Sequence, residues 1–273
     1  MRTEATALRE VPMPAPAAST THRTYEFELP IGVYDDEGRL HRHGMLRKMT
    51  GRDEAILADP QNQRNGGKLV TELLASCIVG LGELKSTGPS LVSEMYSADR
   101  NYLLLRLRGA TFGNELQATY KCPSCGHAHE VTEELDALPV RRMGEEESAG
   151  EIRIRLEDGY IDNQGVAHHA MVMRLPTGAD ESAVAPQMRK NASLGKNALL
   201  ARCMKSLGDV PQHRLNAIGP KLLAELTMTD RRLIDRALNS AAPGVDLIRA
   251  LECPACGHEF KASLDLSHFL ALD

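Results

Sequence analysis

In this 273-residue sequence, two short cysteine motifs, 131 residues apart, have residue types and a spacing that could bind a metal ion. The first reads Cys122-Pro-Ser-Cys125-Gly-His127 and the second reads Cys253-Pro-Ala-Cys256-Gly-His258. Two thiolates three positions apart can bind one metal ion when the turn between them is tight. Proline restricts φ at the start of that turn, and the glycine after the second cysteine can adopt a positive φ without steric cost. Each motif is therefore a candidate pair of metal ligands.

A structural zinc ion takes four ligands in a tetrahedron, so one motif supplies only half of a site. The equivalent motif offers the second pair of thiolates, which predicts one zinc ion shared by four cysteines: Cys122, Cys125, Cys253 and Cys256. A zinc ion closed by four thiolates has no open position, so it would stabilise the fold and would not activate water. Two alternatives stay open. One is a redox-active dithiol, and the other is a single working motif or two separate sites in which His127 or His258 is a ligand.

The two motifs close two collinear segments that share residue types along most of their length. Eight positions from Gly32 to Glu54 recur 127 residues later, and six positions from Leu73 to Gly82 recur 126 residues later. Eleven positions from Gly88 to His127 recur 131 residues later. The offset changes between these blocks as differences in loop length would require. This pattern predicts a tandem duplication.

We expect an α+β fold in which each copy contains a β-hairpin, two or three helices and a zinc-ribbon-like knuckle. The expected boundaries are a disordered tail over residues 1–22, a first repeat with its knuckle over 23–136, a charged and solvated linker over 137–150, and a second repeat with its knuckle over 151–273.

The same local elements are expected in both copies. Residues 25–29 and 152–156 alternate apolar and charged side chains, which predicts half-buried strands, and turn residues follow at 35–38 and 162–165. Apolar residues at helical spacing predict helices over 69–81 and 199–207. Gly-Pro dipeptides at 88–89 and 219–220 predict a break before further helix, including 101–108 and 232–239. Cys77 and Cys203 lie on the apolar stripes, so we interpret them as core residues.

Recurring polar residues outside the knuckles fit structural roles. Thr50 with Asp53, and Thr177 with Asp180, are typical of the first turn of a helix. The histidines after the two predicted turns are interpreted as exposed strand residues: His41, His43, His168 and His169. The sequence contains no Gly-rich phosphate loop, no nucleophile elbow and no His-Glu-x-x-His motif. We therefore predict no catalytic residues and no enzymatic activity.

Composition and charge restrict the possible partners. The chain is 42% hydrophobic and 25% charged, as in globular proteins, and its net charge of −5 gives no general attraction for nucleic acid or anionic lipid. No apolar run approaches the roughly 18 residues that suggest a membrane span. The N-terminus lacks the apolar core of a signal peptide, so we expect a cytoplasmic protein in which the six cysteines are not paired as disulfides.

Four segments of the first copy resemble the T-even-type baseplate-hub proteins of contractile-tailed phages and extracellular contractile injection systems. They are residues 29–41 (LPIGVYDDEGRLH), 49–54 (MTGRDE), 68–75 (KLVTELLA) and 99–106 (DRNYLLLR). The resemblance covers residues 25–140 well and extends only weakly to the second copy. It implies a non-enzymatic role in building the baseplate, with baseplate, tube or spike proteins as partners and oligomerisation as an option. It leaves open whether the protein stays in the finished particle or acts only during assembly.

A second hypothesis is a zinc-ribbon regulator or adaptor that contacts nucleic acid or a polymerase. The net charge of −5 and the absence of interleaved aromatic and basic residues disfavour it.

Overall fold

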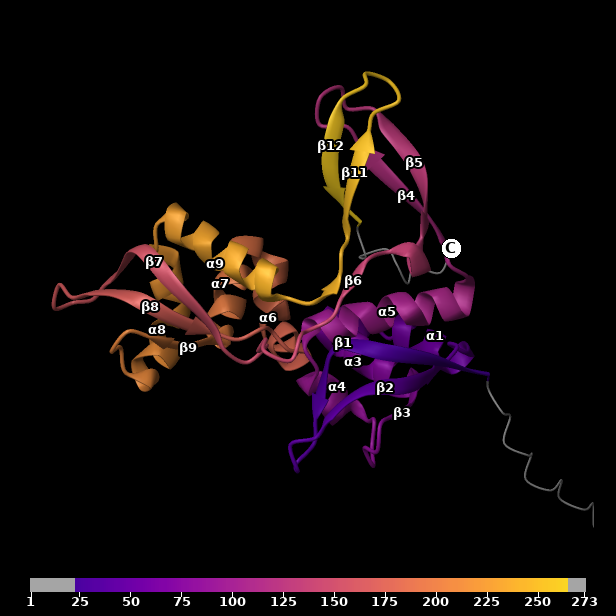
Figure 1. Ribbon diagram of the computed structural model, residues 1–273, viewed down its shortest axis with the longest axis horizontal. Coiled ribbons are helices and arrows are strands. Elements are labelled where there is room, and N and C mark those ends of the chain that lie inside the picture. The colour runs from indigo at the N-terminus through magenta and orange to yellow at the C-terminus, as the bar shows by residue number, and fades with distance from the viewer. Residues whose placement is uncertain (1–22, 265–273) are drawn as a thin grey trace, which may run out of the picture.

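The computed structural model describes residues 23–264. Figure 1 shows two lobes side by side and a pair of β-hairpins that projects from them. The tail predicted over residues 1–22 lies outside the described residues, as do residues 265–273 of the predicted second repeat. Within the described range the architecture is mixed α+β, as expected, with several small antiparallel sheets instead of one continuous sheet. No helix of residues 23–264 has both the length and the apolar character needed to cross a membrane.

The first lobe, residues 24–112, contains a three-stranded sheet of order β1-β2-β3 covered by helices. Its strands are β1 (Thr24–Tyr34), β2 (Leu40–Arg47) and β3 (Ile78–Leu81), and its helices are α1 (Gly51–Ala58), α2 (Pro60–Gln63), α3 (Gly66–Cys77), α4 (Pro89–Glu94) and α5 (Ser97–Phe112). Its core includes Leu29, Leu73 and Leu103, which are fully buried.

The second lobe, residues 152–241, has the strand order β7-β8-β9, which is the order of the first sheet. Its strands are β7 (Ile152–Ile161), β8 (Ala167–Met173) and β9 (Met204–Leu207), and its helices are α6 (Gly178–Lys190), α7 (Ala192–Cys203), α8 (Gln212–Glu225) and α9 (Met228–Ala241). The register of β1 with β2 shifts between Glu28 and Val33, and that of β7 with β8 shifts between Arg155 and Tyr160. The two irregularities therefore fall at equivalent positions.

An aspartate from a helix holds each irregular strand segment. The buried carboxylate of Asp99 in α5 accepts hydrogen bonds from the backbone N–H groups of Ile31 and Gly32, at 2.8 and 2.9 Å. In the second lobe Asp230 of α9 accepts from the N–H of Gly159 at 2.8 Å. Both glycines have positive φ, +96° and +77°, which other residues adopt only with strain. These contacts satisfy the backbone groups that the ladder leaves unpaired.

Two of the predicted helices end earlier than expected. The apolar patterns over 69–81 and 199–207 were interpreted as helix throughout, but α3 ends at Cys77 and α7 at Cys203. The remaining residues form β3 and β9, where Leu81 pairs with Gly44 and Leu207 with Met171. A short apolar run is compatible with a helix or a strand. Here the residues form strands because they can pair with the free edge of the sheet.

The second Gly-Pro dipeptide also differs from the expectation. Gly88 is the N-cap residue of α4 and Pro89 its first residue, as expected for a break before a helix. Pro220 instead lies inside α8, which begins at Gln212. An internal proline removes one helical hydrogen bond, and α8 tolerates this loss.

The segment interpreted as a solvated linker, 137–150, makes ordered contacts. After a short 3₁₀ turn (Leu135–Ala137), β6 (Val140–Arg141) pairs with β10 (Gly244–Val245) from the far end of the second lobe. The guanidinium of Arg141 donates to the carbonyls of Ser240 and Ala241 at the end of α9, at 3.1 and 2.9 Å. The side chains of Met143 and Ala149 are buried. The second lobe is therefore inserted between two strands that pair with each other.

The two lobes meet along a polar contact centred on Arg100. Its guanidinium is only 1% exposed, lies 3.4 Å from the Glu181 carboxylate of α6 and donates to the Val92 carbonyl at 2.9 Å. Backbone hydrogen bonds flank this pair, from Ser97 N–H to the Pro176 carbonyl (2.9 Å) and from Gly178 N–H to the Met95 carbonyl (3.0 Å). The start of α6 thus packs directly on the start of α5.

The variant Gly178→Ala should destabilise the protein by about 1–3 kcal/mol, the usual cost of an overpacked site. A Cβ at this position would clash with the Arg100 guanidinium, which cannot withdraw from its buried partners. Urea unfolding measures the effect. The control is Gly51→Ala at the equivalent position of α1, where a Cβ meets nothing within 4 Å. That control should be neutral or slightly stabilising; equal losses in both variants would contradict a clash between the lobes.

Candidate metal centre

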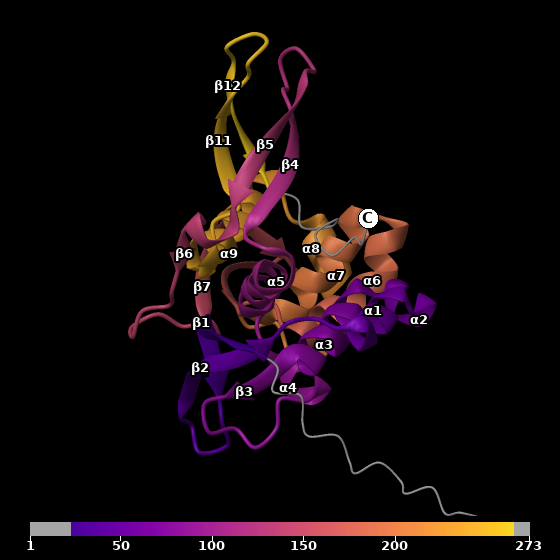
Figure 2. The same cartoon turned by 90° about the vertical axis from the view of Figure 1, so that its right-hand side faces the viewer.

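Two β-hairpins carry the cysteine motifs at their turns. The first hairpin consists of β4 (Glu115–Lys121) and β5 (Ala128–Glu134), and the second of β11 (Ile248–Glu252) and β12 (Glu259–Ser263). Figure 2 shows the two hairpins rising together, with both turns at the end far from the lobes. We call this pair, residues 115–134 and 248–263, the hairpin lobe. Its apolar residues, including Leu251 and Phe260, pack against a buried cluster that runs from Tyr120 of β4 to the core of the first lobe.

A buried ion pair joins the inner faces of the two hairpins. The guanidinium of Arg249 on β11 lies 3.0 Å from the carboxylate of Glu133 on β5, which is 4% exposed. The hydroxyl of Tyr120 on β4 donates to the same carboxylate at 2.9 Å. Burial, together with this hydrogen bond to Glu133, raises the pKa of Tyr120 above its usual range. Because Glu133 has both partners in place, its charge is compensated although it is removed from water.

Both knuckles have the same backbone geometry. Cys122 N–H donates to the His127 carbonyl at 2.9 Å, and Gly126 N–H donates to the Cys122 carbonyl at 3.0 Å. Gly126 has φ +74°, the conformation for which the motif was expected to need glycine. The second knuckle repeats these features: Cys253 N–H to His258 O at 3.0 Å, Gly257 N–H to Cys253 O at 2.9 Å, and Gly257 φ +66°.

The four cysteine sulfurs converge on one point. The Sγ atoms of Cys122, Cys125, Cys253 and Cys256 all lie within 4.8 Å of one another. The Cys122–Cys256 separation is 3.8 Å and the Cys125–Cys253 separation is 3.6 Å. Four sulfurs at about 2.3 Å from a tetrahedral zinc ion lie about 3.8 Å apart, whereas a disulfide would place two of them near 2 Å. The donor set and its spacing therefore fit one four-thiolate zinc site.

The pKa of each cysteine in the cluster depends on the backbone N–H groups and the other sulfurs near its thiol. The backbone N–H groups of Cys125 and Ser124 lower the pKa of Cys122 to about 6, which favours its thiolate. The backbone N–H of His258 acts in the same direction on Cys256, but the neighbouring sulfurs and burial raise the pKa of Cys256 to about 12. Four adjacent thiolates repel one another, and a divalent cation between them would remove that repulsion.

The histidines of the motifs do not join the cluster. In residues 23–264 the four cysteines form the one group of His, Cys, Asp and Glu whose geometry suits a metal ion. The ring of His127 stacks on His129 with centroids 6.2 Å apart, and that of His258 stacks on Phe260 at 6.4 Å. The cluster lies at the tips of the hairpins and not directly between the two lobes. It joins the lobes only through the strands that lead to it.

The remaining cysteines and histidines occupy structural positions. Cys77 and Cys203 are 1% exposed, and burial raises the pKa of each to about 12, which confirms them as core residues. The interpretation of His41 and His168 as exposed is wrong. They are 8% and 7% exposed, and their Nε2 atoms lie 2.9 Å from Asp35 and 3.2 Å from Asp162. An aspartate six residues earlier in both copies was the signal for this contact.

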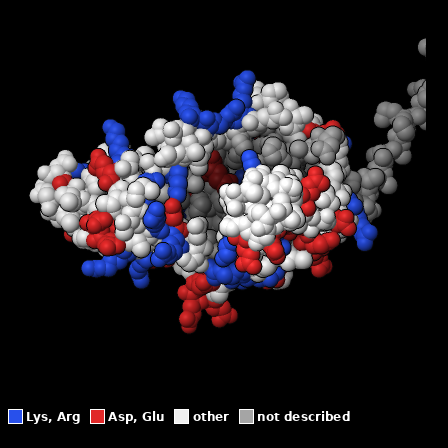
Figure 3. Space-filling view, turned by 90° about the horizontal axis from the view of Figure 1, so that it is seen from above, with Lys and Arg blue, Asp and Glu red and all other residues white. Residues whose placement is uncertain are grey.

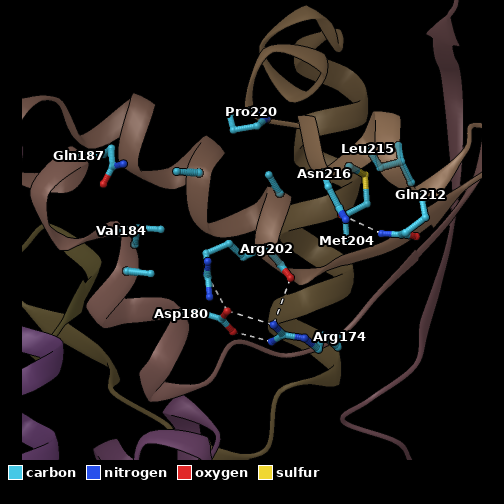
Figure 4. Close-up of a pocket in the computed structure, with 13 residues that line it drawn as sticks. Arg174, Asp180, Val184, Gln187, Arg202, Met204, Gln212, Leu215, Asn216 and Pro220 are labelled. Carbon is cyan, nitrogen blue, oxygen red and sulfur yellow. Dashed lines mark hydrogen bonds and ion pairs between the residues drawn. The ribbon is translucent and has the colours of Figure 1, made fainter. Parts of the chain in front are cut away.

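The threonine–aspartate pairs at the helix starts form capping boxes, as expected. The sequence did not reveal that each aspartate also binds arginine. The 1%-exposed carboxylate of Asp180 accepts from Arg174 at 2.5 and 3.0 Å and from Arg202 at 2.9 Å (Figure 4). An open cavity of about 480 Å³ between α6, α7 and α8 adjoins this group. Because its one carboxylate is already paired with arginine, the cavity offers no acid–base pair.

The fold and the cluster together define a mixed α+β protein in which four cysteines join two hairpins distant in sequence. The chain belongs to the T4 bacteriophage base plate protein family, whose model matches residues 22–271 and so includes both knuckles. This match confirms the resemblance noted in the sequence and extends it to the second half of the chain. It supports a structural role in a phage baseplate, in association with other baseplate or tail components. No curated protein sequence and no solved structure matches the chain.

Proposed function

We propose that this protein is a non-enzymatic component of the hub or spike region of a phage-tail-like baseplate, stabilised by one structural zinc ion. The observation that carries the proposal is the convergence of four sulfurs from two knuckles, in a chain that belongs to a baseplate family. The zinc ligands would be Cys122, Cys125, Cys253 and Cys256. Such an ion supplies cohesion: it would hold β4–β5 against β11–β12 beside the ion pair of Glu133 with Arg249.

We further infer that the two halves arose by tandem duplication, with a zinc-ribbon-like knuckle at the end of each copy. The identical strand orders, the equivalent register shifts and the paired capping boxes support this inference. A duplicated chain would present two similar lobes to neighbouring baseplate proteins. We place its synthesis and its assembly with the tail in the cytoplasm.

If the proposal is correct, the protein should co-purify with tube, spike or other baseplate proteins when these are co-expressed. It should ignore duplex DNA, because its net charge is −5 and it carries no phosphate-tracking basic stripe. Affinity capture followed by mass spectrometry tests the first expectation, and fluorescence anisotropy with labelled DNA tests the second. Salt-sensitive micromolar binding to DNA without capture of tail proteins would favour a zinc-ribbon regulator instead.

A further inference from the structure

One face of the second hairpin lacks partners in the described chain. Its outer face carries two apolar residues, Ala250 and the 59%-exposed Ile248, whereas Leu251 and Phe260 alternate with them along the strands and face the first hairpin. A cavity of about 450 Å³ lies on this hairpin. Two exposed carboxylates stand on its rim, those of Glu252 and Glu259, which face each other directly across the strand pair. Like charges in directly opposite positions destabilise a hairpin. Neither carboxylate forms an ion pair with any residue in 23–264, and Lys261 is the one cation among the residues that line the cavity.

Helix α9 of the second lobe carries two exposed side chains of the opposite charge. Arg232 and Arg236 are one helical turn apart and exposed, and within residues 23–264 neither guanidinium has an ion-pair or hydrogen-bond partner. Like charges at this spacing destabilise a helix in the same way. Met228 precedes them by one turn on the same line and is 66% exposed, one of the most exposed large apolar side chains in the described chain. The outer face of α9 is therefore an apolar side chain followed by two cations.

The two faces match in spacing as well as in charge. Side chains one helical turn apart have Cβ atoms about 5–6 Å apart, and directly opposite side chains on paired strands are about 4.5–5.5 Å apart. The net charges of the two lobes that carry these faces have the same signs as the faces themselves. The second lobe (152–241) contains thirteen Lys and Arg against nine Asp and Glu, whereas the hairpin lobe contains three against six.

Both faces lie on the same side of the molecule. Figure 1 shows α9 along the top of the second lobe, next to the base of the projecting hairpins. Seen from above, a hollow separates the second lobe from the hairpin lobe, with Lys and Arg side chains along the edge nearest the second lobe (Figure 3). The molecule is thus L-shaped, and each arm carries one of the two faces.

We propose that the occupant of this hairpin face is α9 of a second copy of the same chain. In a two-fold dimer the hairpin lobe of each copy would lie over α9 of the other, so that the same contact is made twice. Glu252 and Glu259 then pair with Arg232 and Arg236 of the other copy, and Met228 packs against the exposed apolar residues of the same face, Ile248 and Ala250. Four ion pairs form, and four like-charge repulsions within the separate chains are relieved. The contact does not depend on what the four cysteines bind.

Charge reversal in matched variants tests the dimer. Sedimentation velocity of the full chain should show a monomer–dimer equilibrium that weakens as salt is raised from about 0.05 to 0.5 M, because exposed ion pairs are screened. The variant E252K/E259K and the variant R232E/R236E should each weaken dimerisation by about tenfold or more. An equimolar mixture of the two should dimerise again, since each hairpin then meets an α9 of opposite charge. The four changes in one chain should also restore it.

A control variant separates this contact from general charge effects. E115K/E134K reverses the other directly opposed glutamate pair, on the first hairpin and away from the cavity, with the same change in net charge. It should leave dimerisation unchanged at equal ionic strength. Circular dichroism and the zinc content of every variant establish that the lobes and the knuckles are intact.

Several outcomes would overturn the proposal. A wild-type chain that stays monomeric at low salt and high concentration has no such contact. A dimer that survives both reversals, is lost equally in the control, or is not restored by mixing uses a different surface. A monomer that binds an arginine-rich peptide through Glu252 and Glu259 would assign the hairpin face to another protein.

Discussion

Purified wild-type protein should contain close to one equivalent of zinc, and Cys253→Ser should lose most of it. The substitution removes one thiolate from a site that needs four, and the remaining three ligands hold the ion much more weakly. Elemental analysis after anaerobic purification measures the metal. Hydrogen exchange should accelerate in the hairpin lobe, residues 115–134 and 248–263. It should change little in α3 and α7, because each lobe keeps its own apolar core. Particle assembly should then fail or stall.

Two further variants distinguish one shared zinc site from two separate sites and from a general loss of stability. The double variant Cys122→Ser with Cys253→Ser should be little less stable than either single variant, because both changes remove ligands of one ion. Cys203→Ser alters a buried cysteine outside the cluster and should retain zinc, whatever it costs in stability. Two equivalents of zinc, none after careful anaerobic preparation, or clearly additive losses in the double variant would falsify the shared site.

Asp180→Asn should destabilise the protein by about 3 kcal/mol, the second large effect that we expect. The carboxylate is almost fully buried and accepts from two arginines and from the backbone N–H of Thr177 (3.0 Å). An asparagine cannot compensate the two guanidinium charges, and a broken buried ion pair typically costs about 3–5 kcal/mol. Thermal or urea unfolding measures the loss. The control Asp209→Asn changes an exposed aspartate and should stay within about 0.5 kcal/mol of the wild type.

The effect of Asp180 should depend on pH in a defined direction. Burial alone would raise its pKa, but the hydrogen bonds from Arg174 and Thr177 outweigh burial and lower the pKa to about 2. An aspartate in the unfolded chain has a pKa of about 3.9. The stabilisation is therefore fully present above about pH 4 and is lost as the pH falls through about 2. The difference between wild type and Asp180→Asn should shrink over that interval; a constant difference would contradict this ionisation.

The proximity of the four cysteines could be predicted from the sequence because the motif needs few residues. A cysteine pair, a proline and a glycine determine one tight turn, and the second copy supplies the ligands that the first lacks. The strand alternation at 152–156 and the capping boxes at Thr50 and Thr177 were equally local, and the structure places them as expected. Such features depend on neighbours within a few positions.

The features that the sequence did not reveal depend on partners far along the chain. Leu81 and Leu207 continue a helical pattern, but β2 and β8 offer them a free strand edge. The charged residues of 137–150 suggest solvent, yet Arg141 caps the end of α9 about a hundred residues later. The position of the cluster also depends on partners far apart in the sequence, because the two hairpins lie side by side with the knuckles at their tips.

The insertion of the second lobe between β6 and β10 has a consequence for the chain as it leaves the ribosome. The first hairpin emerges early, but β11 and β12 are made more than a hundred residues later, a delay on the order of ten seconds at usual translation rates. During that interval Leu116, Val131 and the free thiols of Cys122 and Cys125 have no opposite hairpin. A chain that stops before Cys253 can never close its cluster. A closed cysteine cluster therefore marks a chain that has been made at least as far as Cys256, and a product that ends before this point keeps an apolar, oxidisable hairpin that chaperones and proteases can recognise.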